Sequence, residues 1–253
     1  MTRIIAIANQ KGGSAKTTTA INLGAALAAL GRRTLLVDLD PQGHLAEGFG
    51  IAAAGLEHEL SEVLDQKRPL ESILHPLRDH LDLAPANIRL SHLEPYLITR
   101  ARREDRLKHA LVPLLANYAY VLIDCPPSLG ILTVNGFSAA QEILIPMAAE
   151  FYALIGVSLL LDTVRDMRID LNPTLSVLGI IPTRMTRTRH AEAVVARAQE
   201  DLSGQVRVFE PSIPETVKVR DAAAAGLPIR EFDAHSGATI AYQALAEVID
   251  CVH

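Results

Sequence analysis

The chain has 253 residues, of which 49% are hydrophobic and 21% are charged, and its formal net charge is -5. This composition is typical of a globular protein, and the charge excludes attraction of nucleic acid by the whole surface, although a local basic face remains possible. The two cysteines, Cys125 and Cys251, have neither metal-site spacing nor a disulfide framework. No apolar run reaches the roughly 18 residues of a transmembrane helix, so we expect a soluble, cytoplasmic protein without membrane attachment.

Short apolar runs alternate with segments of helical length along the chain. The runs that have the length and composition of strands are 3–8, 33–38, 81–86, 120–124, 142–147 and 175–182. The segments between them with apolar residues at helical spacing are 17–30, 102–117, 130–139, 151–169 and 188–201. Most of the runs are apolar on both faces, which is typical of a parallel sheet covered by helices on both sides. The pattern predicts one α/β domain over residues 1–253, a doubly wound, mostly parallel sheet, with 52–80 as a peripheral excursion.

The first expected strand runs directly into the sequence NQKGGSAKTTT (residues 9–19) and then into an Ala- and Leu-rich helix. A strand, a glycine-bearing loop, Lys-Thr and a helix form the context of a phosphate-binding loop. Gly12 and Gly13 allow a tight turn that exposes N–H groups to phosphate oxygens, next to the positive end of the helix. We expect Lys16 to reach the β- and γ-phosphates of a nucleotide and the Thr17 hydroxyl to hold Mg²⁺.

The loop departs from the strict pattern G-x-x-x-x-G-K-[ST], because Gln10 and Ala15 occupy the positions of its two glycines. On this motif alone, an ordinary strand-to-helix turn stays open. The run KGGSAKTT resembles the deviant Walker A loop, KGGxGKT[ST], of the ParA/MinD family of ATPases. The resemblance implies that Lys11 reaches the phosphates of a second subunit across an ATP-dependent homodimer. It also implies that ATP is bound by the loop residues Gly12, Gly13, Ser14, Ala15, Lys16, Thr17 and Thr18.

Aspartates follow two of the expected strands, at the edge where a parallel sheet binds its ligands. Asp38 and Asp40 lie in the sequence LLVDLDPQG (35–43), where their spacing of two places both on the same side of an extended chain. Asp124 is the last residue of YVLID. Such carboxylates suit Mg²⁺ and the positioning of water, although a pair of this kind also serves as a helix cap or a solvated loop. VDLDPQG and IDCPPSLG resemble switch I and switch II of the same family. The resemblance implies that Asp40 orients the attacking water and that Asp38 and Asp124 support the metal with Thr17.

Basic residues cluster in the C-terminal half of the chain. The stretch RMTRTR carries Arg184, Arg187 and Arg189 without an acid, and Lys218 and Arg220 follow a predicted turn. On one face such residues can contact the phosphates of duplex DNA, or they can form a solvated basic surface. By resemblance, Arg189 and Lys218 match positions at which ParA proteins contact DNA.

The resemblance covers nearly the whole chain and is weakest over 52–110. It places adenine near the strand that ends in IPTRM, which implies base contacts from Thr183 and Pro214. The C-terminal sequence SGATIAYQALAEVIDCVH contains no Lys or Arg, which disfavours the membrane helix of the MinD branch. No pair of cysteines fits an iron–sulfur relative.

Together these features predict a Mg²⁺-dependent ATPase of chromosome or plasmid partition that is associated with the nucleoid. It is expected to bind DNA non-specifically as an ATP-closed homodimer and to hydrolyse ATP slowly until a ParB-type partner stimulates it. Because the chain starts directly at the first strand, no additional N-terminal DNA-reading domain is expected. The alternatives are an ATPase that positions a protein cargo, a switch whose hydrolysis is impaired by Ala15, and a small-molecule ligase of the dethiobiotin-synthetase kind.

Overall fold

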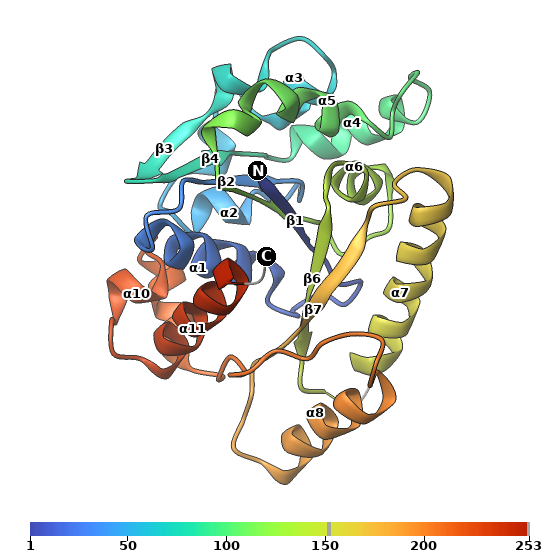
Figure 1. Cartoon of the computed structure of the whole chain (residues 1–253). Coiled ribbons are helices and arrows are strands. Elements are labelled where there is room, and N and C mark those ends of the chain that lie inside the picture. The colour runs from blue at the N-terminus through green and yellow to red at the C-terminus, as the bar shows by residue number, and fades with distance from the viewer. Residues whose placement is uncertain (151–152, 252–253) are drawn as a thin grey trace.

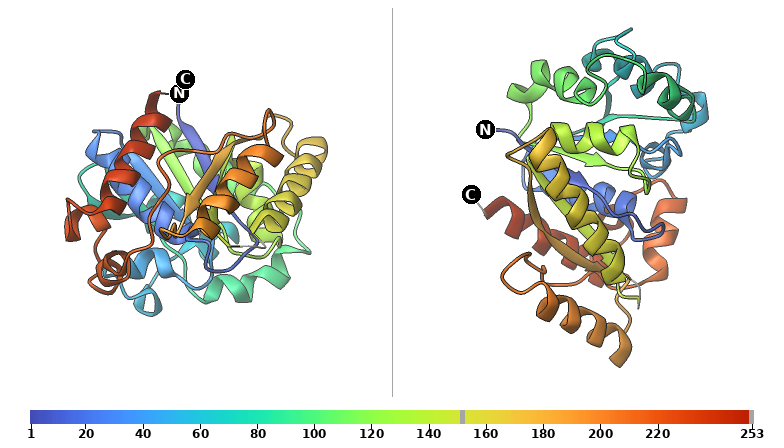
Figure 2. Two further views of the ribbon diagram at one scale, coloured as in Figure 1. Left: turned by 90° about the horizontal axis from the view of Figure 1, so that it is seen from below. Right: turned by 90° about the vertical axis from the view of Figure 1, so that its right-hand side faces the viewer.

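The structure is a computed structural model that describes residues 1–150 and 153–251. Within these residues, a seven-stranded sheet has the order β3–β4–β2–β5–β1–β6–β7, with helices on both of its faces (Figures 1 and 2). Neighbouring strands are parallel except for β3 and β4, which pair antiparallel at one edge. The doubly wound, mostly parallel α/β fold predicted from the sequence is therefore confirmed.

The strands are β1 (Arg3–Ile7), β2 (Thr34–Asp38), β3 (His75–Arg78), β4 (Leu81–Ala84), β5 (Tyr120–Asp124), β6 (Glu142–Ala148) and β7 (Ser176–Thr183). The α-helices are α1 (Lys16–Ala29), α2 (His44–Glu47), α3 (Leu60–Leu64), α4 (Arg89–Leu97), α5 (Arg106–Leu111), α6 (Ile131–Ala139), α7 (Ala153–Asp170), α8 (Arg189–Asp201), α9 (Val217–Ala224), α10 (Ile229–Phe232) and α11 (Gly237–Cys251). Short 3-10 helices are η1 (Ala53–Gly55), η2 (Leu70–Ile73) and η3 (Val112–Asn117).

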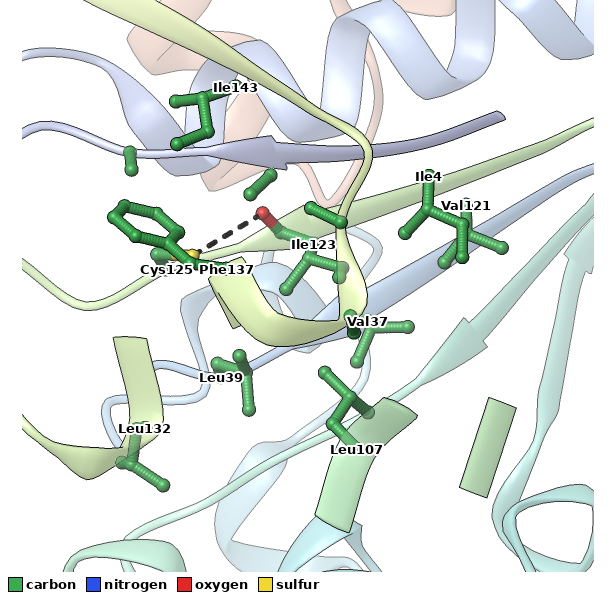
Figure 3. Packing of buried hydrophobic residues seen from close by; sticks show 14 of the residues in the cluster. Ile4, Val37, Leu39, Leu107, Val121, Ile123, Cys125, Leu132, Phe137 and Ile143 are labelled. Carbon is green, nitrogen blue, oxygen red and sulfur yellow. Dashed lines mark hydrogen bonds between the residues drawn. The ribbon is translucent and has the colours of Figure 1, made fainter. Parts of the chain in front are cut away.

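The side chains of the central strands alternate between two hydrophobic layers, one on each face of the sheet. In β1, Ile5 and Ile7 join the layer that contains α1 and α11, whereas Ile4 and Ala6 join the layer formed with α5, α6 and α7. Figure 3 shows the second layer, in which Phe137 of α6 packs among strand residues. Because both faces are buried, these strands appear in the sequence as continuous apolar runs.

Six expected strands correspond to β1, β2, β4, β5, β6 and β7, and β3 is additional. Its sequence, HPLR, is short and half-exposed, and its proline cannot donate to a strand ladder, which is tolerated at a sheet edge. The helix predicted over 102–117 is wrong at its start, because Arg102 has a φ of 53° and α5 begins only at Arg106. Helices α4 and α9–α11 are also additional. Residues 151–152, the start of the helix predicted over 151–169, lie outside the described residues.

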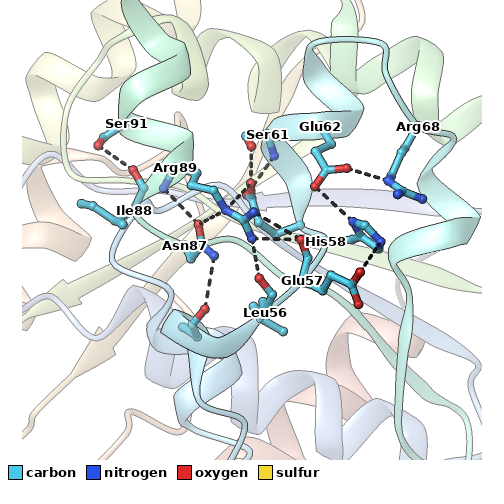
Figure 4. A network of polar contacts seen from close by, with 12 residues as sticks. Leu56, Glu57, His58, Ser61, Glu62, Arg68, Asn87, Ile88, Arg89 and Ser91 are labelled. Atoms are coloured by element: carbon cyan, nitrogen blue, oxygen red, sulfur yellow. Dashed lines mark hydrogen bonds and ion pairs between the residues drawn. The ribbon is translucent and has the colours of Figure 1, made fainter.

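The excursion at 52–80 is held to the start of α4 by polar side chains (Figure 4). Arg89 donates from its guanidinium to the carbonyl of Glu57 at 3.2 Å, and its backbone N–H donates to the Asn87 side chain at 3.0 Å. The Asn87 amide in turn donates to the carbonyl of Ala53 at 3.2 Å. These bonds hold the part of the excursion that precedes β3, whereas β3 itself pairs with β4 at the edge of the sheet. Among the described helices, none combines the length and apolar character needed to cross a membrane.

Two glycines bring the segment after α2 against the turn that follows α9. Gly50 and Gly226 have φ values of 75° and 68°, which favour glycine. A Cβ atom on Gly226 would lie 2.6 Å from the Cα atom and 2.7 Å from the backbone nitrogen of Gly50. Backbone atoms cannot turn aside as a flexible side chain can, so this contact requires glycine.

Gly226→Ala is therefore expected to lower the free energy of unfolding by about 2–4 kcal/mol, from a backbone clash added to left-handed strain. Gly31→Ala is the matched control, since Gly31 has a φ of 75° and open space around its Cβ position. It should cost only about 1 kcal/mol. Urea unfolding measures both values, and equal losses would show that the contact with Gly50 adds nothing.

Candidate nucleotide-binding site

The candidate site lies where three central strands of the sheet end at the same level. In the sheet register Ile7, the last residue of β1, pairs with Asp124 of β5, and Asp124 pairs with Asp38 of β2. The loop from Ala8 to Ala15 follows β1 directly and leads into α1. The phosphate-loop residues therefore begin beside the two aspartates that the sequence analysis singled out. This is the carboxyl edge of a parallel sheet, where α/β proteins bind ligands.

Helix α1 starts without a side-chain cap. Its N-cap residue is Ala15, and its first turn contains no acidic residue. The N–H groups at this end and the positive end of the helix dipole are therefore available to an anion. Ala15 has φ 69° and ψ 31°, the left-handed conformation that side chains rarely adopt. Ala15 replaces a glycine of the phosphate-loop pattern, and its left-handed backbone gives a reason why glycine suits this position.

Lys16 is buried at the start of α1, with 8% of its surface exposed. Its Nζ atom donates a hydrogen bond to the carbonyl of Lys11 at 3.3 Å. Burial lowers the pKa of Lys16, while the negative charges of Asp124 and Asp40 oppose that shift. A buried ammonium group is stable only with anionic partners. Lys16 therefore lies where its ammonium group can interact both with the phosphates of a nucleotide and with Asp124 and Asp40.

Asp124 is fully buried, and neither of its carboxylate oxygens has a hydrogen-bond partner among the described residues. The pKa of Asp124 is raised to about 7, chiefly by burial and also by the charge of Asp40, while the nearby Thr17 hydroxyl and the charge of Lys16 oppose the rise. An unpartnered buried carboxylate beside a hydroxyl fits a Mg²⁺ ion held directly or through water. No group of three or more His, Cys, Asp or Glu side chains in the described part of the chain could hold a metal alone. Mg²⁺ commonly completes such a site with substrate phosphates and water.

Asp38 and Asp40 make different contacts although they lie two residues apart. Asp38 is fully buried, and its oxygens accept hydrogen bonds from the backbone N–H groups of Asp40 at 3.0 Å and Leu45 at 3.3 Å. Burial raises the pKa of Asp38, and the charge of Asp124 adds to the shift. Asp40 is half-buried and accepts from the N–H of Gln42 at 3.0 Å. Asp38 thus shapes the loop into α2, and Asp40 presents a charge that acts on the buried site.

A cavity of about 250 Å³ opens beside the phosphate loop. Its walls are Gly13, Ala15, Thr18, Thr183, Arg184, Ile213, Pro214, Glu215, Thr216, Val219, Arg220 and Tyr242. The Thr183 hydroxyl donates to the carbonyl of Ser14 at 3.1 Å, which ties the end of β7 to the loop. Pro214 is held by a backbone bridge to Met185. The structure therefore places both residues predicted to contact the base, Thr183 and Pro214, on the wall of one cavity.

Lys11 is held by its own subunit, in an ion pair with Glu150. The Glu150 carboxylate also lies 3.7 Å from the Arg184 guanidinium, which lies 3.2 Å from Glu215. Lys11, Glu150, Arg184 and Glu215 thus form a chain of ion pairs across the loop. The sequence analysis missed both glutamates. Glu150 closely follows β6, so the rule that identified Asp38, acids at the carboxyl ends of strands, could have found it.

The basic residues predicted to contact DNA do not form one group. Arg184 and Arg220 line the cavity, and Lys218 forms an ion pair with Asp233. Arg187 and Arg189 are exposed and make no ion pair with a described residue. Arg220 is likewise exposed without an ion pair to a described residue, but it lines the cavity, so of the five only Arg187 and Arg189 are exposed, without an ion pair and outside the cavity.

Comparison with known proteins relates the whole chain to one family. A family model described as an AAA domain matches residues 2–177. The chain is 44% identical over 245 residues to the chromosome partitioning protein ParA of Myxococcus xanthus, covering 96% of this chain and 86% of that protein. It is 41% identical over 251 residues to the sporulation initiation inhibitor protein Soj of Bacillus subtilis, covering 98% of both.

A solved structure shares the fold at similar identity. The cobyrinic acid a,c-diamide synthase of Mycobacterium smegmatis with bound ADP and magnesium superposes with a TM-score of 0.87 and 40% identity, covering 98% of this chain and 94% of that one. The same protein was also solved with an ATP analogue and magnesium. Both relatives and structure extend over nearly the whole chain, beyond the residues that the family model matches.

Ala15→Gly is expected to raise the free energy of unfolding by about 0.5–1 kcal/mol, because relief of left-handed strain exceeds the added entropy of the unfolded chain. Ala196→Gly is the control, since Ala196 is exposed within α8. Glycine there should cost about 0.5–1 kcal/mol. Urea unfolding without nucleotide measures both, and a loss of stability in both variants would contradict strain at Ala15.

Asp124→Asn is expected to change the free energy of unfolding of the metal-free protein by less than about 1 kcal/mol, because the loss of an unpartnered buried charge is offset by the loss of an anionic neighbour of Lys16. The same variant should bind Mg²⁺–nucleotide more weakly. Asp38→Asn is the control, since both Asp38 oxygens accept backbone N–H groups and an amide has only one such oxygen. It should destabilise the protein by about 1–3 kcal/mol. If Asp124→Asn destabilised the metal-free protein to the same extent, its carboxylate would have a structural role instead.

Proposed function

The chain belongs to the ParA/MinD family of ATPases, and we propose that it is a single-domain, Mg²⁺-dependent ATPase of DNA partition. It binds ATP, closes into a sandwich homodimer and then binds DNA without reading its sequence. The observation that carries this proposal is the meeting of the uncapped start of α1, buried Lys16 and unpartnered Asp124 at one sheet edge. The ADP and magnesium bound to the similar M. smegmatis protein support the same ligands here.

Each residue of the site has a part in hydrolysis. The loop N–H groups and Lys16 hold the phosphates and neutralise their charge, which is most of what phosphoryl transfer asks of a protein. Thr17 and Asp124 would hold Mg²⁺, and Asp38 would support them by fixing the neighbouring loop. The bound metal would neutralise charge that develops on the phosphate oxygens. Asp40 orients the attacking water from the half-buried rim of the site.

An apolar surface next to the phosphate loop supports the homodimer. Leu129, Ile155 and Leu159 are 40%, 58% and 51% exposed, although they are large hydrophobic residues. The start of α7 lies beside the loop, since a Cβ atom on Gly156 would be 3.6 Å from the Asn9 side chain. Burying such side chains against a second copy is favourable. In the closed dimer, Lys11 would leave its ion pair with Glu150 and bind the phosphates of the nucleotide in the other subunit.

The DNA contacts are proposed for Arg187 and Arg189 of each subunit. Closure doubles the number of phosphate contacts, and the logarithm of the binding constant scales with that number. ATP would therefore switch on DNA binding and association with the nucleoid. Lys218 would join these contacts after release from Asp233. Hydrolysis, slow in the isolated protein and stimulated by a ParB-type partner, would reset the dimer.

A second candidate is a small-molecule ligase, because the similar M. smegmatis structure carries the name of a synthase. Two observations favour partition. The relatives named for chromosome partitioning and sporulation are 44% and 41% identical to the chain, slightly more than the 40% of the synthase structure. The exposed apolar residues beside the loop also favour closure against another subunit over an open pocket for an organic substrate.

The test is binding to a non-specific DNA duplex without nucleotide, with ADP, and with ATP and Mg²⁺, at two salt concentrations. We expect tight, salt-sensitive DNA binding only in the presence of ATP and Mg²⁺. Lys16→Ala should lose this binding. Arg189→Ala should weaken binding about 3- to 10-fold and reduce the salt slope by about 1 for each phosphate that is no longer neutralised. Arg197→Ala is the matched control on α8, since Arg197 is paired with Glu200 and Asp201.

Three results would contradict the proposal in whole or in part. Equal DNA binding, or none, in all three nucleotide states would remove the ATP-switched DNA function if Ala15→Gly behaved in the same way. ATP-dependent binding in Ala15→Gly alone would instead identify the natural chain as a switch impaired by Ala15. An unchanged salt slope in Arg189→Ala would exclude that arginine from the interface.

A further inference from the structure

Arg184 lines the cavity beside the phosphate loop although 47% of its side chain is exposed, whereas Arg187 and Arg189, which follow it, do not line the cavity. Its guanidinium donates a hydrogen bond from Nη1 to the carbonyl of Gly13 at 3.4 Å. Its Nη2 atom lies 3.2 Å from the carboxylate of Glu215, which also lines the cavity. The side chain therefore spans from the phosphate loop to the segment that carries Pro214.

The backbone fixes this orientation. Arg184 has a φ of 51°, a left-handed conformation that costs a non-glycine residue about 1–2 kcal/mol. On the next residue, the N–H of Met185 donates to the carbonyl of Ile213 at 3.0 Å, and its carbonyl accepts from the N–H of Glu215 at 2.9 Å. Strained conformations persist where the surrounding structure determines them and often accompany binding sites. Here two strand-like bonds hold the turn that brings the arginine back over the loop.

The cavity that Arg184 covers fits the nucleoside half of a nucleotide. Lys16 and Thr17, the residues assigned to the terminal phosphates and the metal, are not among its walls. The walls include apolar side chains of Ile213, Pro214 and Val219. A planar guanidinium can stack on an aromatic ring and donate hydrogen bonds at its edge. An arginine over a largely apolar cavity thus has the chemistry to hold a purine ring and its ribose.

We propose that Arg184 is a nucleotide-contacting residue that closes the cavity over the base and ribose, and that it is not part of the DNA-binding face. This inference rests on the proposed function in one respect, namely that the loop binds ATP. Glu150 and Glu215 hold the guanidinium in position before the nucleotide arrives, and both are partly exposed, with 49% and 37% of their side chains accessible. The guanidinium therefore keeps its planar faces for the ligand while its edges are paired.

The contact is linked to Lys11 through Glu150, which pairs with both cations. When Lys11 turns to the phosphates of a second subunit, Glu150 keeps Arg184 as its remaining partner in this chain of ion pairs. Closure of the dimer thus strengthens the position of Arg184 over the nucleoside. The Glu150 carboxylate thus links Lys11, the residue proposed for the dimer contact, to Arg184, the residue proposed to cover the cavity.

The experiment is calorimetric titration of the full-length protein with ATP and with ADP, each with saturating Mg²⁺, for wild type, Arg184→Ala, Arg184→Lys and Arg197→Ala. Arg184→Ala is expected to weaken the binding of both ADP and ATP by about 3- to 30-fold, because the arginine contacts the nucleoside that both ligands share, and ATP should be affected at least as strongly as ADP. Arg184→Lys, which keeps the charge but not the planar group, should give a smaller reduction in affinity. Arg197→Ala should bind like wild type, since Arg197 is also an exposed arginine with two acidic partners.

A DNA measurement at saturating ATP completes the test. Arg184→Ala should retain the wild-type salt slope for DNA, in contrast to Arg189→Ala. Unchanged nucleotide affinity in Arg184→Ala would overturn the inference, as would a weakening confined to ATP or a reduced DNA salt slope. If wild type itself bound neither ATP nor ADP, the proposed function would fail instead, so the two failures are distinguishable. Circular dichroism of each variant establishes that the fold is retained.

Discussion

The burial of one lysine among aspartates at the end of the sheet is the constraint on which the rest of the structure depends. Lys16 supplies one positive charge against Asp40 and the buried Asp38 and Asp124, so the site carries excess negative charge when all three are ionised. Burial raises the pKa of both buried acids, because a charge costs free energy where water is excluded. Backbone N–H groups compensate Asp38, but Asp124 has no such partner among the described residues. The site is therefore incomplete in charge, and a divalent cation bound with a nucleotide is the kind of ligand that completes it.

The acidic site is connected through backbone contacts to segments farther from the sheet. Asp38 fixes the loop that begins α2 by accepting the N–H of Leu45. The segment after α2 then meets the turn after α9 at the contact of Gly50 with Gly226. Helix α9 follows directly from the cavity wall at Thr216, whose side chain accepts the N–H of Lys218. The acidic loop is thus connected to the wall of the cavity through packed segments, and their tightest contact joins backbone atoms of Gly50 and Gly226.

The sequence predicted the central fold well because burial on both faces of the sheet leaves a simple mark, a continuous apolar run. It predicted poorly the edge at β3 and the helix α4, since β3 is half-exposed and α4 contains Pro95 and few buried residues. The motifs located the phosphate loop and its acids, but their roles stay predictions. What sequence could not supply was conformation and distant contact. The left-handed backbone at Ala15 and Arg184 leaves no mark in composition, and the partners of Arg184 lie far along the chain at Gly13 and Glu215.

The ion pair between Lys11 and Glu150 can be read as a barrier to dimer closure or as a guide for it, and magnitudes favour the guide. Both side chains are partly exposed, at 33% and 49%, and exposed ion pairs contribute only about 0–1 kcal/mol. Hydrogen bonds to charged groups in a water-excluded interface are stronger, at about 1.5–3 kcal/mol. A lysine that exchanges Glu150 for a phosphate between two subunits therefore gains more than it loses. Until that exchange, Glu150 keeps the side chain ordered beside the loop, so less conformational entropy is lost on closure than for a free lysine.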